Sequence, residues 1–333
     1  MRNESTPPLN PPDCTDFTPS RVNHFDVFAA MGVRWGGCVE ARPHPWDVND
    51  RPPRTGDRDS FFVPWLWPDE NGDGRSRNDY LPNFDPRDPL WAPPSWLHLP
   101  ASDPRAYWEL ERAWVWKYSS GVRPRDTELT THPLSSRRLG PNMSCPDPLV
   151  PLTNDRRRLL DAAGSFTARG ASGTAMNLGL VWAWRMLSPN FVPEARPFAR
   201  ENRKFIILMT DGFNELVPQI GQGQPGTTFN ISDYTGYGYL ENNRLGTRNR
   251  ERAMEVLDAR TEQVCRNIKG QDIEIFTVMF DPDGYLDSSY VEWLLGRCAT
   301  NANTHVFRAS DGQQLIGAFR AIGNQINALR IAR

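Results

Sequence analysis

Residues 203–214, with the sequence RKFIILMTDGFN, restrict the fold of this chain more than any other segment. Five consecutive apolar residues, 205–209, are followed by Thr210, Asp211 and Gly212. A short apolar run that ends in polar residues and glycine predicts a strand buried on both faces of a parallel sheet. Ligands of open α/β sheets bind just beyond the carboxyl ends of the strands. Asp211 is therefore either a functional carboxylate at the edge of the sheet or a residue that only closes a turn.

The second half of the chain, residues 153–333, alternates predicted helices with predicted strands. Strands are predicted at residues 205–209, 272–280 and 304–307, and helices at residues 155–163, 174–187, 248–269, 288–298 and from 311 onward. This alternation predicts a doubly wound α/β fold with a mostly parallel sheet that helices cover on both faces. The last helix should be capped by Asp311 and pack through a stripe formed by Leu315, Phe319, Ile322, Ile326 and Leu329.

Residues 35–152 are rich in tryptophan and proline. Nine of the twelve tryptophans lie between Trp35 and Trp116. Proline interrupts helices and sheets, but so many large aromatic side chains need burial. We therefore expect a long, irregular insertion that is nevertheless folded, with one helix that begins at Asp103 and Pro104.

Residues 1–34 form a polar segment with few structural signals. Residues 22–31 could form one short helix. Residues 33–41, VRWGGCVEA, could form an edge strand with an irregularity at the paired glycines. None of these patterns points to a binding function.

Charge and hydropathy argue against two broad classes of partner. The 333 residues contain 38 basic and 40 acidic side chains, for a net charge of −2, and no block of like charges occurs. We therefore expect no binding to nucleic acid. No run approaches the roughly 18 apolar residues of a membrane span, and residues 1–14 lack the apolar core of a signal peptide.

Two polar side chains in the second half of the chain suggest a metal-binding site. Thr174 and Asp211 are both predicted at turns on the carboxyl edge of the sheet. Hydroxyl and carboxylate oxygens are ligands for Mg²⁺ or Ca²⁺, so the two residues could form an incomplete metal site. The alternative is that Thr174 is an ordinary cap at the start of a helix.

A second candidate for a metal lies in the insertion. Asp69, Asn71 and Asp73 belong to the sequence DENGDG, which matches the first half of a calcium-binding loop. The glutamate expected at the twelfth position is replaced by Tyr80. The residues therefore form either a weak calcium site or an acidic surface turn.

The sequence FDPDG at residues 280–284 follows a predicted strand and resembles the aspartyl nucleophile motif of haloacid-dehalogenase-type phosphatases. In that family most of the fold follows the motif, whereas only about fifty residues follow it here, and the last lysine is Lys269. We interpret Asp281 and Asp283 as turn residues. A metal-dependent, phosphatase-like hydrolase that uses these aspartates with Asp211 is the alternative function.

Several longer motifs resemble one family of bacterial envelope proteins. FIILMTDGFN and GTAMNLGLVWAWRMLSP resemble the third and second metal-site loops of a von Willebrand factor A domain. WGGCVEARP, FFVPWLWPDE, CPDPLVPLT, SDYTGYGYLENNRLG and CATNANTHVFRAS, in this order, resemble TadG-like proteins of tight-adherence (Flp) pilus assembly. The resemblance covers residues 22–333. It implies a non-catalytic interaction module in pilus assembly, with pilus-assembly or envelope proteins as partners.

The resemblance also implies parts that this sequence does not show. The family has an N-terminal membrane helix and a DxSxS strand that begins the A domain. In a Rossmann-type sheet the strands lie side by side in the order 3-2-1-4-5-6. In this scheme the three predicted strands are the fourth, fifth and sixth, and residues 33–41 supply the third. We therefore expect a truncated reading frame, with the anchor encoded upstream, and an unpaired, apolar edge on the strand at residues 205–209.

The same resemblance places the chain outside the cytoplasm, in the periplasmic part of the bacterial envelope, where disulfides persist. Cys38 opens the insertion and Cys145 closes it. Cys265 lies on a predicted helix, and Cys298 lies at the end of the next one. We expect the pairs Cys38–Cys145 and Cys265–Cys298, with Cys14 free.

Overall fold

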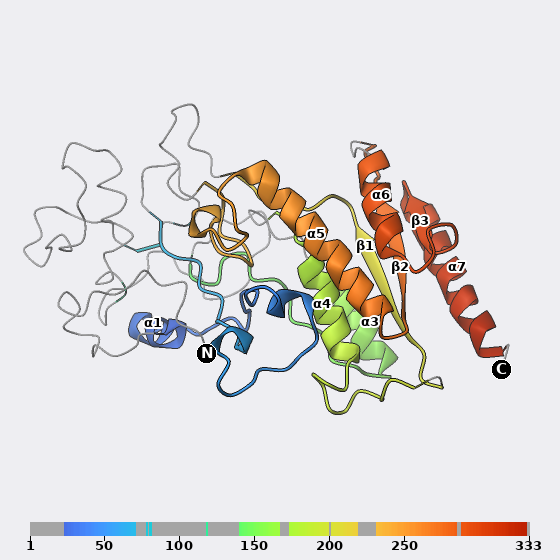
Figure 1. The fold of residues 1–333 in the computed structure, drawn as a ribbon, viewed down its shortest axis with the longest axis horizontal. Helices are drawn as coiled ribbons and strands as arrows, with labels where there is room; N and C mark the ends of the chain where they lie inside the picture. The colour runs from blue at the N-terminus through green and yellow to red at the C-terminus, as the bar shows by residue number, and fades with distance from the viewer. Residues whose placement is uncertain are drawn as a thin grey trace, which may run out of the picture. The chain divides into compact units, whose positions relative to one another are not determined.

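The computed structural model describes residues 23–70, 78, 80, 81, 118, 140–166, 173–199, 201–218, 231–284 and 288–331. The chain folds as two compact units (Figure 1). Unit 1 consists of Met1–Arg42, Pro53–Ser172 and Leu216–Arg250, and unit 2 consists of Pro43–Pro52, Gly173–Glu215 and Glu251–Arg333. Ten residues of the tryptophan-rich segment thus belong with the sheet, and Leu216–Arg250 belongs with unit 1.

Unit 2 contains a three-stranded parallel sheet. Its strands are β1 (Lys204–Thr210), β2 (Ile273–Phe280) and β3 (Val306–Ala309), in the order β1-β2-β3. The register places Ile207 beside Phe276 and Val278 beside Phe307. The predicted α/β class and the parallel sheet are confirmed, although β3 begins two residues later than the sequence suggests.

Three helices cover one face of this sheet: α4 (Met176–Leu187), α5 (Arg250–Lys269) and α6 (Ser288–Cys298). Two buried clusters connect them to the strands. The members of these clusters on the strands include Ile206, Ile273, Ile275 and Met279, and those on the helices include Leu180, Trp184, Val264, Ile268, Leu294 and Leu295. This face therefore forms the main core of unit 2.

The opposite face is covered only in part by the described residues. Helix α7 (Gly312–Ile331) packs Ala318 and Ile322 against Phe276 and Val278 of β2. Asp311 caps this helix, as predicted, since its carboxylate accepts a hydrogen bond from the Gln314 amide at 2.8 Å.

Beside α7, the side chains of Ile207 and Met209 remain 38% and 49% exposed. We call these two residues the open face of β1. The prediction that residues 205–209 are buried on both faces is therefore wrong for this face, because α7 packs on β2 and β3. Phe319 was expected in the packed stripe of α7, but it is 41% exposed.

Pro43–Pro52 is held in unit 2 by buried polar contacts and by buried apolar side chains. Val48 is 1% exposed and joins the core formed by α4 and α5. The Arg260 guanidinium donates to the buried Asp47 carboxylate at 2.7 Å. Arg185 of α4 donates to the Trp46 carbonyl at 2.9 Å. The segment is thus part of the sheet unit and not a free linker.

Unit 1 contains short helices connected by irregular chain: α1 (His24–Met31), α3 (Arg156–Ser165) and the 3-10 helices η3 (Arg58–Ser60) and η5 (Leu240–Asn242). Helix α1 starts with a capping box between Asn23 and Asp26 and ends at Gly32, whose φ is 68°. This pattern of caps confirms a short helix at the start of the described chain.

The edge strand predicted at residues 33–41 is wrong. Among the described residues, this segment makes only an isolated antiparallel bridge between Val39 and Pro64. Gly37 has φ 92°, a backbone conformation that glycine adopts readily but that does not belong to a strand. The two glycines therefore prevent regular strand pairing in this segment.

Aromatic side chains form much of the core of unit 1, as expected for the described part of the insertion. Trp65, Trp67, Tyr234 and Tyr239 lie with Cys145 in one buried cluster. The Tyr234 hydroxyl and the Arg244 guanidinium both donate to the buried Glu40 carboxylate. The predicted helix that begins at Asp103 lies outside the described residues, and so does Cys14.

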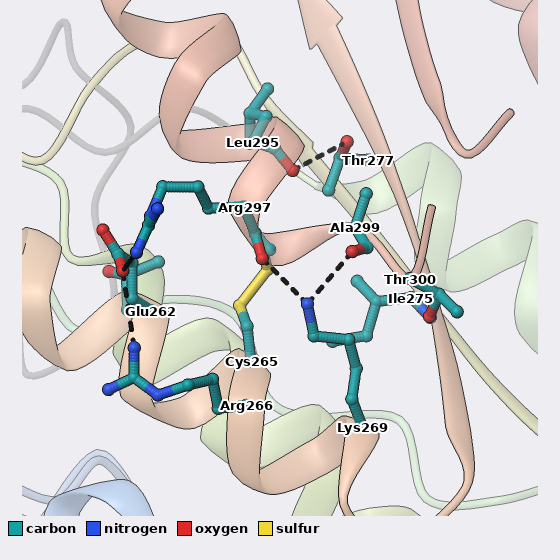
Figure 2. Close-up of a disulfide and its surroundings, with 12 residues drawn as sticks. Glu262, Cys265, Arg266, Lys269, Ile275, Thr277, Leu295, Arg297, Ala299 and Thr300 are labelled. Carbon is teal, nitrogen blue, oxygen red and sulfur yellow. Dashed lines mark hydrogen bonds and ion pairs between the residues drawn. A yellow bond between two sulfur atoms is a disulfide. The ribbon is translucent and has the colours of Figure 1, made fainter. Parts of the chain in front are cut away.

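The structure joins Cys38 to Cys145 and Cys265 to Cys298, with Cα separations of 5.9 and 5.0 Å. These are the two pairs expected above. The second disulfide connects α5 to the end of α6, and Figure 2 shows its surroundings. The Lys269 ammonium donates to the carbonyls of Arg297 and Ala299 at 2.8 and 3.1 Å, so the two helices are connected by more than the sulfur atoms.

No helix in the part of the chain described here is long and apolar enough to cross a membrane.

We expect the double substitution Cys265→Ala and Cys298→Ala to lower the free energy of unfolding by about 3–4 kcal/mol, because the disulfide closes a loop of 33 residues in the unfolded chain. Urea unfolding of the parent and the variant measures the difference. Ser310→Ala, at an exposed position of unit 2, is the control and should leave stability unchanged. A loss below about 1 kcal/mol in the double variant would show that the disulfide does not restrict the unfolded chain.

Candidate functional site

The carboxyl end of β1 closes in a turn made by Thr210. Its hydroxyl donates to the Gly212 carbonyl at 2.9 Å and accepts from the Gly212 amide at 3.1 Å. Asp211 lies within this turn and its side chain is exposed. The turn therefore does not require the Asp211 carboxylate, which is left facing solvent.

Thr174 lies beside the segment that follows this turn. Its amide donates to the Glu215 carbonyl, and the Glu215 amide donates to the Thr174 carbonyl, both at 2.9 Å. The structure thus brings the segments of Thr174 and Asp211 together at the carboxyl edge of the sheet. Thr174 is not the cap of α4, because the capping position is Ala175.

Asn214 replaces the expected threonine cap. Its side-chain carbonyl accepts a hydrogen bond from the Met176 amide at 2.8 Å, which satisfies a donor at the start of α4. Its amide nitrogen donates to Asp258 at 2.7 Å and to Thr261 at 3.1 Å, both on α5. Sequence patterns near α4 could not reveal this role, because Asn214 is 38 residues from the amide it caps.

Asp258 extends these contacts to α6. Its second oxygen accepts a hydrogen bond from the Tyr290 hydroxyl. Burial raises the pKa of Asp258 above its ordinary value, although the hydrogen bonds from Tyr290 and Asn214 act in the opposite direction. Burial, followed by the hydrogen bond to Asp258, raises the pKa of Tyr290. The network connects the three helices of one sheet face through polar side chains.

The structure describes only some of the residues that form the predicted metal sites. Within the described ranges, no group of three or more His, Cys, Asp or Glu side chains is placed to hold a metal ion. Thr174 and Asp211 remain a prediction of an incomplete site for Mg²⁺ or Ca²⁺. Two protein ligands would leave most of the coordination sphere to water.

Asp69, the first residue of the calcium-loop motif, is 3% exposed and not part of a surface turn. One of its carboxylate oxygens accepts hydrogen bonds from the Tyr80 and Leu81 amides at 2.7 and 2.6 Å. Asn71 and Asp73 lie outside the described residues. The Asp69 carboxylate therefore orients the chain near Tyr80, and a calcium ion at this motif stays a prediction.

Asp281 and Asp283 lie just beyond the carboxyl end of β2. The Asp281 amide donates to the Ala309 carbonyl at 2.9 Å, which continues the pairing with β3. Asp283 is exposed in the turn that follows. Asp283 thus lies in a turn, as interpreted from the sequence, whereas the Asp281 amide still takes part in the pairing with β3.

The sequence at residues 218–246 is rich in glycine, asparagine and tyrosine, which predicts a long loop that could form a binding surface with the Asp211 edge, but the described part of this segment is not a free surface. Within residues 231–246, the side chains of Tyr234, Tyr237, Tyr239 and Leu240 are 5% exposed or less. A cavity of about 10 Å³ is lined by Leu216, Thr235, Tyr237, Gly238, Tyr239, Leu240, Arg244 and Leu245. A cavity of this size holds about one water molecule and is too small for a substrate.

The open face of β1 is the strongest candidate for binding in unit 2. Among the residues that the structure describes, β1 pairs with β2 alone, so its outer edge has no strand beside it. Ile207 and Met209 are exposed on this strand, and Phe213, just after it, is 41% exposed. Unpaired strand edges and exposed apolar side chains are typical of protein interaction surfaces. Sequence reasoning expected the free edge but not which face would be open.

Comparison of the chain with protein-family models, with curated proteins and with solved structures finds no match.

The Asp258 network predicts a pH effect on stability. Because the folded-state pKa of Asp258 is raised, its ionised form opposes folding. The contribution of Asp258 to stability is most favourable at pH values below the unfolded-state pKa of about 4. It is lost as the pH rises through the folded-state pKa. Asp258→Asn does not titrate. Its side-chain oxygen can accept from Asn214, and its amide nitrogen can donate to the Tyr290 hydroxyl oxygen, which reverses the direction of that hydrogen bond. We expect the variant to be at least as stable as the parent at pH 7 and to lack this decline.

Urea unfolding at pH 4, 5.5 and 7 measures the stability of each protein and its dependence on pH, with the exposed Asp283→Asn as the control. The interpretation fails if Asp258→Asn is less stable than the parent at pH 7 and retains the pH dependence of the parent.

The incomplete metal site predicts weak binding. Titration calorimetry with MgCl₂ should give a dissociation constant weaker than about 1 mM, because Thr174 and Asp211 supply only two ligands. Asp211→Ala should leave the heat signal nearly unchanged. Tight binding that is lost in Asp211→Ala would contradict this prediction.

Proposed function

We propose that the chain is a non-catalytic protein-interaction module that acts in Flp (tight-adherence) pilus assembly at the bacterial cell envelope, within a TadG-like protein that has a von Willebrand factor A-like sheet. The TadG-like motifs described above, in their order along the chain, support this proposal. The parallel order β1-β2-β3 is compatible with the last three strands of such a domain.

The two disulfides support the proposed location outside the cytoplasm. Disulfides persist in oxidising compartments such as the periplasm and are rare in the reducing cytosol. One connects Cys38 with Cys145 in unit 1, and the other connects Cys265 with Cys298 in unit 2. Each unit therefore has its own covalent link, as expected for a protein of the envelope.

The observation that carries the proposed activity is the open face of β1. Ile207 and Met209 expose apolar side chains on a strand whose other face is packed by α4. A strand with a free edge can add a strand from a partner, whose side chains then cover the exposed apolar groups. We propose that pilus-assembly or envelope proteins bind here, and that Asp211 at the end of the strand borders the surface.

Complementation of a gene deletion in the source bacterium tests this function. The deletion strain should lack Flp pili, and the parental gene should restore them. A gene with Ile207→Glu and Met209→Glu should restore fewer than one tenth of the pili counted by electron microscopy. Charges on the open face should block docking but leave the fold intact, because both side chains already contact solvent.

Leu152→Glu is the matched control, since this leucine is 56% exposed in unit 1. It should restore pili fully. Thermal unfolding of the purified variants must show equal stability. Normal pili with the double variant would contradict an interaction at the open face, and normal pili in the deletion strain would contradict the role in pilus assembly.

A further inference from the structure

Helix α3 (Arg156–Ser165) has no buried residue. The side chains of Leu159 and Leu160 are 45% and 59% exposed, and Phe166, which follows the helix directly, is 62% exposed. Contact between water and large apolar side chains is unfavourable, so a group of them on a surface marks a place where something else binds. The helix thus exposes apolar side chains that the described chain does not cover.

The side chains of α3 are divided between an apolar face and a polar face. At roughly 3.6 residues per turn, Leu159, Leu160 and Ala163 fall on one side of the helix, which we call the apolar face of α3. Asp161 and Ser165 fall on the opposite side. A short helix that is polar overall but has one apolar face is typical of segments that lie along the boundary between lipid and water.

Three consecutive arginines, Arg156, Arg157 and Arg158, begin the helix, and all three side chains are exposed. Arg157 and Arg158 lie on the two flanks of the apolar face. None of the three forms an ion pair with an acidic side chain of the described residues. Their charges therefore remain available for an anionic ligand, and the planar guanidinium group of arginine is well suited to binding phosphate.

The helix is formed before any ligand binds. The Asp155 carboxylate accepts hydrogen bonds from the amides of Arg157 and Arg158 at 2.9 and 3.2 Å. This cap satisfies amides that the first turn of a helix otherwise leaves without a partner. A ligand therefore does not have to fold the segment, and less conformational entropy is lost on binding.

A lipid surface fits this helix better than a protein partner does. Stable protein interfaces bury about 800 Å² on each partner, whereas α3 offers only a few large apolar side chains on a short, convex surface. Single side chains can enter the boundary between lipid head groups and acyl chains without a matching pocket. The arginines on the flanks can then reach the lipid phosphates, and Asp161 on the opposite side stays in water.

We propose that α3 lies along the surface of a membrane that contains anionic phospholipids, with its apolar face in the head-group region and its arginines on the lipid phosphates. Each arginine near an anionic membrane strengthens binding about fivefold. The leucines of the apolar face and Phe166 add the apolar contribution. Neither contribution is large alone, so the binding is reversible and weakens as salt screens the charges.

This inference goes beyond the proposed function. The interaction surface proposed above consists of Ile207 and Met209 in unit 2, whereas α3 belongs to unit 1. Lipid binding is measured on the purified protein and pilus assembly in cells, so that either proposal can fail alone.

Co-sedimentation of the purified protein with lipid vesicles tests the inference. One set of vesicles contains phosphatidylglycerol and phosphatidylcholine in equal parts, and the other contains phosphatidylcholine alone. The parental protein should bind the anionic vesicles at least about tenfold more tightly, because neutral vesicles attract only the apolar face.

Two variants of α3 separate the contributions. Arg157→Glu should weaken binding to the anionic vesicles about tenfold or more, because the local charge changes by two units. It should keep the helix, since an acidic side chain is favourable in the first turn. Leu160→Glu should also weaken binding about tenfold or more, because it removes an apolar contact and adds a negative charge.

Arg320→Glu and Ile316→Glu are the matched controls, since both residues are exposed on α7 in unit 2 and undergo the same changes. Each should change the affinity for anionic vesicles less than about twofold. The double variant Ile207→Glu and Met209→Glu should also bind these vesicles like the parent, because the open face of β1 is not the lipid-binding surface.

Four results would overturn the proposal. The parental protein fails to bind the anionic vesicles, or it binds both kinds of vesicle equally. The control variants weaken binding as much as the α3 variants do, which would show attraction to the net charge alone. Leu160→Glu converts a dimer into a monomer in the absence of lipid, which would show that the apolar face of α3 is an interface between copies of the chain.

Discussion

A parallel β-sheet is stable only when both of its faces are covered, and this requirement organises the whole of unit 2. Helices α4, α5 and α6 pack on one face and bury its core over β1 and β2. Helix α7 covers the other face over β2 and β3, and the described residues leave Ile207 and Met209 of β1 exposed there. The apolar strand is therefore both part of the core and part of the surface. Our proposal that the chain binds other proteins depends on this incomplete cover.

The face packed by α4, α5 and α6 is held by contacts that make it a firm support for binding at the open face. Pro43–Pro52 inserts Val48 into the core and pairs Asp47 with Arg260. Asn214 connects the start of α4 with α5, and Asp258 continues the connection to α6. The disulfide between Cys265 and Cys298 joins the far ends of α5 and α6. Breaking one partner of a buried ion pair typically costs about 3–5 kcal/mol, so these contacts resist local opening.

The sequence alone identifies the elements that depend on local patterns. The apolar runs of β1 and β2 are strong local signals, and the structure confirms both strands. The strand predicted at residues 33–41 does not form, because the left-handed backbone at Gly37 limits its pairing to one isolated bridge between Val39 and Pro64. The packing of Val48 and the cap by Asn214 are contacts between distant parts of the chain, and no local pattern encodes them. The incomplete cover of β1 depends on where α7 packs and could not be derived from the apolar run itself.

Hydrogen–deuterium exchange of the isolated chain tests most directly whether β1 is an open edge strand. Amides of a strand that has neighbours on both sides are protected, whereas a free edge leaves alternate amides in contact with water. We predict that the peptide spanning Lys204–Thr210 exchanges measurably faster than the peptide spanning Ile273–Phe280, which lies between two strands. Equal protection of the two strands would show that β1 is covered in the isolated chain, and it would contradict an interaction surface at the open face.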